Sequence, residues 1–309
     1  MRNKLVVVTG GAGFIGSHIA EELRNDNEVI VIDNLYTGRE ENVPDGVSFV
    51  RADVRDYGAI AELIREADYV FHEAAQVSVV ESIEDPVFTE EVNVLGTLNI
   101  LKALLDGHGK LVFASSAAVY GDNPNLPLKE SERPRPLSPY GVTKWAAEEY
   151  LRVFHELYGL PVVALRYFNV FGPRQGANQY AGVINIFINH ALKGEPLVIF
   201  GDGKQTRDFI YVRDVVKANI LAAESSGADG RVFNVGTGKS TSVLELATKV
   251  LEITGSNGSI LFDKPRPGDI RHSLADIGEI KRLGFKPEWS LEEGLKKTVE
   301  WYRTTSGIS

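Results

Sequence analysis

The chain has 309 residues, of which 43% are apolar, enough to build one large domain or two smaller ones around a packed core. Its formal charge is −9 and it carries no basic tail or cluster, which argues against a nucleic acid or another polyanion as a partner. No apolar run approaches the ~20 residues of a membrane span, and no cysteine is present for a disulfide or a thiolate metal site. We therefore expect a cytoplasmic protein with no metal site and no membrane association.

The N-terminal stretch predicts a phosphate-binding turn between a strand and a helix. Residues 5–9 form an unbroken apolar run, as in buried parallel strands, and a helical stretch follows up to Leu23. Between them, glycines recur at every third position. Glycines at this spacing allow a tight turn and a close approach of the backbone to a pyrophosphate, to which the helix start offers free N–H groups. The predicted contacts are Gly10, Gly13, Phe14, Ile15 and Gly16. For the glycines alone, a purely structural turn remains the alternative.

The second predicted strand, residues 29–32, is followed by Asp33 and Asn34. Asp33 stands 17 residues after the last glycine, where a carboxylate can accept hydrogen bonds from the ribose hydroxyls of a dinucleotide. The same carboxylate would repel a 2′-phosphate. The sequence therefore predicts NAD as the cofactor in preference to NADP.

Strands and helices continue to alternate up to residue 167. The predicted strands are 47–50, 69–72, 110–114 and 162–167, and the predicted helices are 57–66, 87–105 and 139–158. This period predicts a parallel, doubly wound sheet that binds ligands at the carboxyl ends of its strands. Small or polar residues follow those ends, and we predict the following as cofactor contacts: Asp53, Val54, Ala74, Ala75, Gln76 and Ser115.

Tyr140 and Lys144 lie four residues apart in the predicted helix 139–158, on one face. We expect the Lys144 ammonium to hold the pKa of the phenol below its usual ~10. A phenolate near neutral pH can remove the proton of an alcohol while hydride leaves the carbon. Tyr-x-x-x-Lys alone occurs by chance in many helices. Ser116, at a strand end, is a candidate partner for a substrate hydroxyl, although a serine there is often a cap.

The second half of the chain changes pattern. Predicted helices cover 183–192, 212–224, 243–253, 277–283 and 291–302, and predicted strands cover 197–200, 206–211, 231–235 and 259–262. Arg174, Arg207 and Arg266 stand in polar or loop-like settings, where a pair could clamp a diphosphate. For any one of them alone, a solvated surface arginine paired with an acid is the better interpretation.

The predicted fold is α/β: a Rossmann-type doubly wound parallel sheet with a smaller, interwoven C-terminal substrate lobe. We assign residues 1–168 to an NAD-binding domain, with 212–236 returning to it. Residues 169–211 and 237–309 would form the smaller, substrate-binding lobe. No repeat, low-complexity tract or flexible linker separates the two.

The chain resembles the extended short-chain dehydrogenases/reductases, and within them the nucleotide-sugar 4-epimerases, with the UDP-glucose (UDP-galactose) 4-epimerases as the best match. The matching blocks are 9–16 (TGGAGFIG), 115–121 (SSAAVYG), 140–144 (YGVTK), 166–172 (RYFNVFG), 207–212 (RDFIYV) and 266–269 (RPGD). The first and third belong to the whole superfamily, and the last three are more specific to nucleotide-sugar enzymes.

This resemblance implies roles for particular residues. Tyr140 would be the acid–base group, Lys144 would bind the nicotinamide ribose, and Ser116 would contact the sugar near its 4-hydroxyl. Asn93 and Tyr167 would line the nicotinamide side. The implied substrate contacts are Asn169, Arg207 and Arg266 at the diphosphate, Phe200 at the uracil, Asp269 at the uridine ribose, and also Val183, Val198 and Ser273.

The resemblance implies NAD-dependent epimerisation of UDP-galactose to UDP-glucose through a transient 4-keto sugar. Related dehydratases and decarboxylases carry acids after the serine, whereas this chain has Ala117 and Ala118. Ser273 stands where bacterial UDP-galactose enzymes have a bulky tyrosine beside the 2-substituent of the sugar. The smaller side chain favours the hypothesis that UDP-N-acetylhexosamines are also accepted.

The resemblance further implies a homodimer, formed by packing helices 87–105 and 139–158 of each subunit into a four-helix bundle. Two alternative functions stay open. One is an epimerase or reductase for another nucleotide sugar, such as a UDP-uronate or a dTDP-sugar. The other is a non-catalytic dinucleotide sensor, which the intact Ser116, Tyr140 and Lys144 disfavour.

Overall fold

Seven parallel strands form the central sheet of the protein, whose computed structural model describes residues 1–176, 182–265 and 270–306. Their order across the sheet is β11-β6-β5-β4-β1-β2-β3. The strands are β1 (Leu5–Thr9), β2 (Glu28–Asp33), β3 (Ser48–Arg51), β4 (Tyr69–His72), β5 (Lys110–Ser116), β6 (Val162–Tyr167) and β11 (Arg231–Val235). This sheet, wound in both directions from β1, confirms the predicted Rossmann-type fold class.

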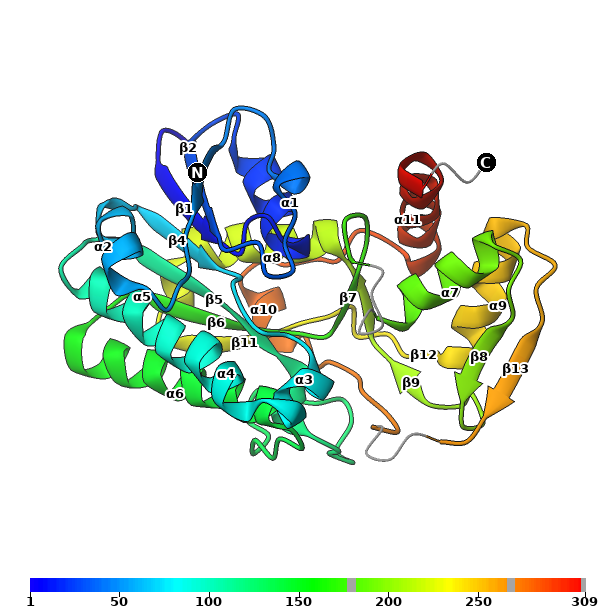
Figure 1. Cartoon of the computed structure of the whole chain (residues 1–309). Coiled ribbons are helices and arrows are strands. Elements are labelled where there is room, and N and C mark those ends of the chain that lie inside the picture. Colours follow the sequence, from blue (N-terminus) through cyan, green and yellow to red (C-terminus); the bar gives the residue numbers. More distant parts are fainter. Residues whose placement is uncertain (177–181, 266–269, 307–309) are drawn as a thin grey trace.

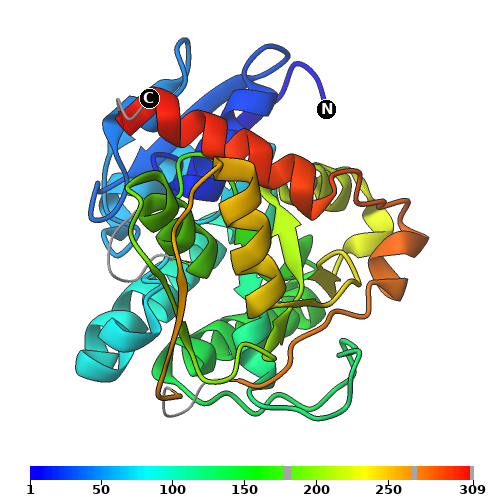
Figure 2. The same ribbon diagram turned by 90° about the vertical axis from the view of Figure 1, so that its right-hand side faces the viewer.

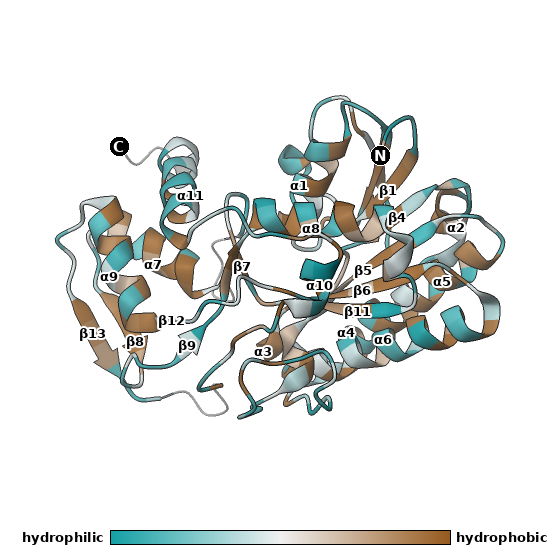
Figure 3. Cartoon of the chain, turned by 180° about the vertical axis from the view of Figure 1, so that it is seen from behind, coloured by the Kyte–Doolittle hydropathy of each residue, from teal (hydrophilic) through white to brown (hydrophobic). Residues whose placement is uncertain are grey.

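Helices cover both faces of the sheet (Figure 1). One face packs against α1 (Phe14–Leu23) and α8 (Val212–Glu224), which share a core with Val8, Val112 and Leu165. The other face packs against α2 (Tyr57–Glu66), α5 (Gly96–Leu105) and α6 (Pro139–Tyr158). Because both faces are buried, the strands are apolar runs without alternation. In Figure 3 they are brown, while outward-facing helical residues are largely teal.

A cavity is expected where the strand order reverses. β1 lies between β2 and β4, and the chain crosses from β3 back over β1 to reach β4. Connections leave these strands toward opposite faces of the sheet and so diverge at the carboxyl ends. The loops after β1 and β4, which carry Gly10 and Ala74, therefore border a natural crevice.

A second lobe lies beside the sheet and has its own core. It contains α7 (Val183–Leu192), α9 (Val243–Thr254) and α11 (Leu291–Ser306) together with the paired strands β8 (Leu197–Phe200) and β13 (Ile260–Asp263). Figure 2 shows α11 (red) crossing one end of α9 (gold), which it contacts. Leu246, Val250 and Leu295 are fully buried between these elements. Within the described ranges, none of the helices has the length and apolar character required to cross a membrane.

The chain departs from the predicted elements at three places. The predicted helix 87–105 is divided into α4 (Pro86–Glu90), a π-helical turn (Glu91–Leu95) and α5, and a short helix, α3 (Val79–Glu84), precedes it. The predicted strand 206–211 becomes β9 (Thr206–Arg207) and β10 (Phe209–Tyr211). β10 pairs with β7 (Asn169–Phe171), a segment predicted to be irregular, and β9 pairs with β12 (Thr241–Ser242).

A buried carboxylate explains the break between β9 and β10. Asp208 is fully buried and accepts hydrogen bonds from the backbone N–H groups of Thr237 and Gly238, at 2.8 and 2.9 Å. These contacts satisfy a buried charge and fix the strand to the loop after β11. The chain therefore pairs with β12 before Asp208 and with β7 after it.

Candidate functional site

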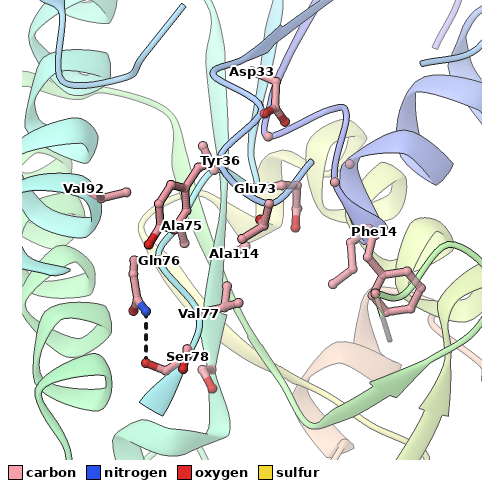
Figure 4. A pocket seen from close by; sticks show the side chains of 18 of the residues that line it. Phe14, Asp33, Tyr36, Glu73, Ala75, Gln76, Val77, Ser78, Val92 and Ala114 are labelled. Atoms are coloured by element: carbon pink, nitrogen blue, oxygen red, sulfur yellow. Dashed lines mark hydrogen bonds between the residues drawn. The ribbon is translucent and has the colours of Figure 1, made fainter. Parts of the chain in front are cut away.

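A cavity of about 470 Å³ lies at the carboxyl ends of the sheet strands, between the sheet and the second lobe. Figure 4 shows Asp33 toward one end of it, Ser78 toward the other, and Glu73 between them. Most predicted cofactor residues line it, together with two predicted substrate residues, Ser116 and Asn169. They are Gly10, Gly13, Phe14, Ile15, Gly16, Asp33, Asn34, Asp53, Val54, Ala74, Ala75, Gln76, Ser115, Ser116, Tyr140, Lys144, Tyr167 and Asn169.

The glycine turn at the floor of the cavity has no room for side chains at two positions. Gly10 has a φ of +70°, and a Cβ there would lie 2.5 Å from the backbone nitrogen of Ala74. A Cβ at Gly16 would lie 2.4 Å from the carbonyl oxygen of Gly10. The turn thus runs directly into the start of α1 with its backbone exposed to the cavity. This cradle fits a pyrophosphate, which backbone N–H groups and a helix N-terminus can bind.

Asp33 closes the same end of the cavity. Its carboxylate accepts hydrogen bonds from the backbone N–H groups of Ala12, at 3.1 Å, and Leu35, at 2.8 Å. Burial raises the pKa of Asp33, and these two hydrogen bonds oppose the effect. The carboxylate is therefore fixed beside the glycine turn, where it can accept from ribose hydroxyls. The donor set and the geometry of this end fit NAD.

Ser116 and α6 bring the predicted catalytic groups to the opposite wall. α6 begins at Ser138, whose Oγ accepts from the Gly141 N–H at 3.2 Å, with Pro139 in the first turn. Tyr140 and Lys144 follow one turn apart. Ser116 ends β5, and its Oγ accepts from the Ala118 N–H at 3.1 Å, which leaves its own hydrogen for another partner. The three residues line one cavity with the glycine turn.

The predicted lowering of the Tyr140 pKa by Lys144 is wrong, because the pKa of Tyr140 is raised. Burial raises the pKa of Tyr140, a hydrogen bond from Ser116 lowers it, and the charge of Glu73 raises it. Lys144 Nζ lies 6.0 Å from the centre of the Tyr140 ring and donates to the carbonyl of Ala114 at 2.8 Å. Burial also lowers the pKa of Lys144, to about 8. For Tyr140, removal from water therefore outweighs the hydrogen bond from Ser116.

Glu73 is a cavity residue that the sequence analysis missed. It follows β4 directly, and its Oε1 lies 2.8 Å from the hydroxyl oxygen of Tyr167. Burial raises the pKa of Glu73 to about 7. The signal was present, because residue 73 stands at a strand end beside predicted contacts at 74–76. Because a glutamate at this position matches no expected contact with a cofactor or substrate, no role was predicted for it.

A buried ion pair behind the wall holds Ser115 and β6 in place. Arg166 donates to Glu148 through Nε at 2.9 Å and Nη2 at 2.6 Å, and both side chains are only 4% exposed. Glu148 also accepts from the Ser115 hydroxyl, and Arg166 Nη1 donates to Tyr120 at 2.9 Å. This network connects the end of β5 to α6, which carries Tyr140 and Lys144. The ion pair between Glu148 and Arg166 therefore holds β5, β6 and α6 in position behind the cavity wall.

Asn93 supports the cavity from behind and does not line it. Its side-chain Oδ1 accepts from the Gln76 N–H at 2.8 Å, and its Nδ2 donates to the Gln76 carbonyl and to Thr143 Oγ1, each at 3.0 Å. The π-helical turn places Asn93 at this depth between β4 and α6. Among the described residues, no three His, Asp or Glu side chains gather closely enough to hold a metal ion.

The remaining predicted substrate residues spread over the second lobe. Phe200 borders a separate hollow with Asp202 and Arg271, and Val198 lies on the same strand, β8. Val183 begins α7, and Arg207 lies in β9. Ser273 is buried, and its N–H donates to the Thr206 carbonyl at 3.1 Å, so it lies beside β9 and not on the large cavity. Arg266 and Asp269 lie outside the described residues.

Arg174, one of the three arginines considered for a diphosphate, lines the large cavity. Its Nη2 lies 3.1 Å from Glu21 of α1, so it forms an ion pair at the cavity edge. The structure thus separates the three arginines: Arg174 borders the cofactor side and Arg207 the second lobe, while Arg266 is not described.

The chain is similar to known proteins over almost its whole length. A model of the "NAD dependent epimerase/dehydratase family" matches residues 6–236. A putative UDP-glucose 4-epimerase of Methanocaldococcus jannaschii is 45% identical over 98% of this chain and 99% of its own. The structure of a UDP-N-acetylglucosamine 4-epimerase from Methanobrevibacter ruminantium, in complex with UDP-N-acetylmuramic acid, is 46% identical with a TM-score of 0.95, over 98% of this chain and 99% of its own. A UDP-glucose 4-epimerase from Thermus thermophilus, in complex with NAD, is 44% identical with a TM-score of 0.90, over 97% and 99% of the two chains.

Proposed function

The chain belongs to the NAD-dependent epimerase/dehydratase family, and from that premise we propose that it inverts carbon 4 of UDP-hexoses, interconverting UDP-galactose and UDP-glucose. The family confirms the prediction of NAD as cofactor and the resemblance to extended short-chain dehydrogenases/reductases. The main observation in support is that Ser116, Tyr140 and Lys144 face one cavity with the glycine turn and Asp33.

The proposed reaction assigns one task to each of these side chains. Bound NAD supplies a hydride acceptor beside the sugar. Tyr140, as phenolate, accepts the proton of the 4-hydroxyl and returns it to the same oxygen after the keto sugar has turned over and presents the other face of carbon 4. Ser116 can turn its hydroxyl hydrogen, which otherwise stabilises the Tyr140 phenolate, toward the 4-oxygen of the sugar, and the Lys144 ammonium stabilises negative charge at this end of the cavity.

Inversion requires the sugar to turn over while the nucleotide stays bound. We propose that Asn169, on the large cavity, and the second-lobe residues Phe200, Arg207, Arg266 and Asp269 hold the UDP part. The hexose end then lies against small side chains, since Ala117 and Ala118 follow Ser116 directly. No carboxyl group stands at those two positions to assist elimination or decarboxylation, which favours simple epimerisation over both.

The function is tested by incubating the purified protein with UDP-galactose alone and measuring UDP-glucose by chromatography. Because the hydride is returned in each cycle, we expect conversion to equilibrium without added oxidant. A panel of UDP-uronates and dTDP-sugars, assayed in the same way, separates the proposal from an epimerase with another substrate. Failure to convert any nucleotide sugar, with NAD demonstrably bound, would favour a dinucleotide sensor.

We further propose that UDP-N-acetylhexosamines are substrates, because Ser273 replaces the bulky residue expected beside the 2-substituent. The similar Methanobrevibacter structure, described as a UDP-N-acetylglucosamine 4-epimerase, supports this. We expect Ser273→Tyr to lower kcat/KM for acetylated sugars relative to plain ones by at least about 100-fold, since a filled pocket excludes the larger group. Ser273→Ala is the matched control and should keep the wild-type ratio. Absence of activity of the wild type on acetylated sugars would refute the idea.

A homodimer is also proposed, through α4, α5 and α6. Val87 is 65% exposed in α4, and Val142 and Trp145, three residues apart on α6, are also exposed large apolar side chains. These helices contact one another within the subunit, so the residues belong to one apolar surface that water would otherwise cover. A second copy of this surface would complete a four-helix bundle.

We expect the double variant Val87→Glu/Trp145→Glu to be monomeric where the wild type is dimeric, because two carboxylates would be buried without partners. Sedimentation velocity measures this directly. Leu244→Glu is the matched control, since Leu244 is an exposed leucine in the second lobe. A wild type that sediments as a monomer at high concentration would contradict the dimer.

A further inference from the structure

Glu73 forms one end of a hydrogen-bond chain that continues through Tyr167 to Asn219 and has no part in the proposed reaction. The hydroxyl oxygen of Tyr167 lies 2.8 Å from Glu73 Oε1 and 2.9 Å from Asn219 Oδ1. Asn219 Nδ2 donates to the carbonyl of Val215, one turn earlier in α8, at 2.9 Å. Because only the amide nitrogen can face that carbonyl, Asn219 presents its oxygen, an acceptor, to Tyr167.

If Glu73 is ionised, this hydrogen-bond chain has one donor hydrogen too few for its acceptors. The single hydroxyl hydrogen of Tyr167 would then face two acceptors and could serve one of them. Asn219 is 0% exposed, and within the described part of the chain no other side chain donates to its Oδ1. An unserved oxygen at that depth costs free energy. A proton on Glu73 completes the chain, because the carboxyl group donates to Tyr167 and Tyr167 donates to Asn219.

The charged and titratable neighbours of Glu73 come from α6 and β6. α6 supplies Lys144 and Tyr140, and β6 supplies Tyr167. α8 supplies the uncharged Asn219, and the glycine turn brings only the backbone of Gly10. Within the described ranges, Lys144 is thus the one cation that acts on Glu73, and it also lies next to Tyr140. An anion on either Glu73 or Tyr140 disfavours an anion on the other.

We propose that the chain through Tyr167 to Asn219 holds Glu73 as the neutral acid, and that loss of this proton places a negative charge beside Tyr140 and opposes its ionisation. This rests on the proposed function, in which Tyr140 acts as a base. Glu73 acts through Tyr140 and is therefore a positioning residue, not a group that touches the reacting atoms. With its pKa at about 7, Glu73 loses its proton as the pH rises through neutrality, and the new charge then raises the pKa of Tyr140 further.

Glu73→Gln tests whether the charge of Glu73 opposes the ionisation of Tyr140. Glutamine has the same size, cannot ionise, and can donate through its amide to Tyr167, so the chain to Asn219 is preserved. Ionisation of Tyr140 is measured as the difference in near-ultraviolet tyrosinate absorbance between each protein and its Tyr140→Phe counterpart. We expect the midpoint to fall by about one pH unit in E73Q, as when a neighbouring like charge is removed. An unchanged or higher midpoint would overturn the proposal.

The proton itself is measured by infrared spectroscopy. In wild type, the C=O band of a protonated carboxylic acid should lose intensity between about pH 5 and about pH 9, and this component should be absent in E73Q. Glu81→Gln is the matched control: Glu81 lines the same cavity but accepts from Gln76 at 2.8 Å, outside the chain, so its loss should leave the band. A wild-type spectrum without such a band would refute the proposal even if E73Q did not fold.

Neither measurement requires turnover. If the protein converts no nucleotide sugar but both spectroscopic results hold, the proposed function fails while the effect of the Glu73 proton on Tyr140 stands. If turnover is found, the acid limb of the pH–rate profile should move down by the same amount in E73Q, a shift that a merely structural role of Glu73 would not produce.

Discussion

Tyr140→Phe is expected to lower the turnover of UDP-galactose by about 100- to 10,000-fold, the usual contribution of a positioned acid–base group. The variant keeps the ring and removes only the hydroxyl that exchanges the proton with the 4-oxygen. Because KM reflects mainly the grip on the UDP part, it should change little. Initial rates measured from UDP-glucose formation, with NAD content checked by release on denaturation, give both parameters.

The matched control is Tyr150→Phe, which removes a hydroxyl from the same helix at an exposed position away from the cavity. It should retain wild-type turnover. If Tyr140→Phe instead kept near-native turnover, the proton would have to move through another group, and Ser116 and Glu73 would be the next candidates. A loss of bound NAD in Tyr140→Phe would assign the residue to binding and not to proton transfer.

The main sheet could be predicted because each of its strands is a short apolar run that ends in a glycine or polar turn. The helices α2, α6, α7 and α8 begin and end at the predicted residues, since their apolar periodicity is interrupted by clear caps such as Ser138 and Gly159. The π-helical turn at Glu91–Leu95 was not predictable. It depends on Asn93 reaching Gln76 and Thr143, and these contacts are remote in sequence.

The properties of the candidate site likewise divide into those that sequence spacing predicts and those that depend on packing. Residues recognised by spacing, such as Gly10, Gly16 and Asp33, line the predicted cavity because strand order alone brings their loops together. The electrostatics of Tyr140 did not follow from spacing. A separation of four residues places Lys144 on the same face, but the degree of burial and the presence of Glu73 decide the direction of the pKa shift. Both depend on packing between β4, β6 and α6.

Glu148→Ala is expected to lower the free energy of unfolding by about 3–5 kcal/mol, the usual cost of leaving one partner of a buried ion pair unpaired. Arg166 would keep its charge at 4% exposure while losing both hydrogen bonds to the carboxylate. Ser115 would lose its acceptor as well. Denaturant titration followed by tryptophan fluorescence measures the loss, and a shift of several degrees in Tm should accompany it.

Glu149→Ala is the matched control, because the adjacent glutamate pairs with Arg152 at 2.9 Å on the exposed face of the same helix. Such pairs contribute about 0–1 kcal/mol. The double variant Glu148→Leu/Arg166→Met separates two causes of the loss. If the unpaired guanidinium is responsible, removing both charges should restore most of the stability. If the double variant is as unstable as Glu148→Ala, the loss comes from the contacts with Ser115 and Tyr120, and the network stabilises the carboxyl end of β5 through packing and hydrogen bonding.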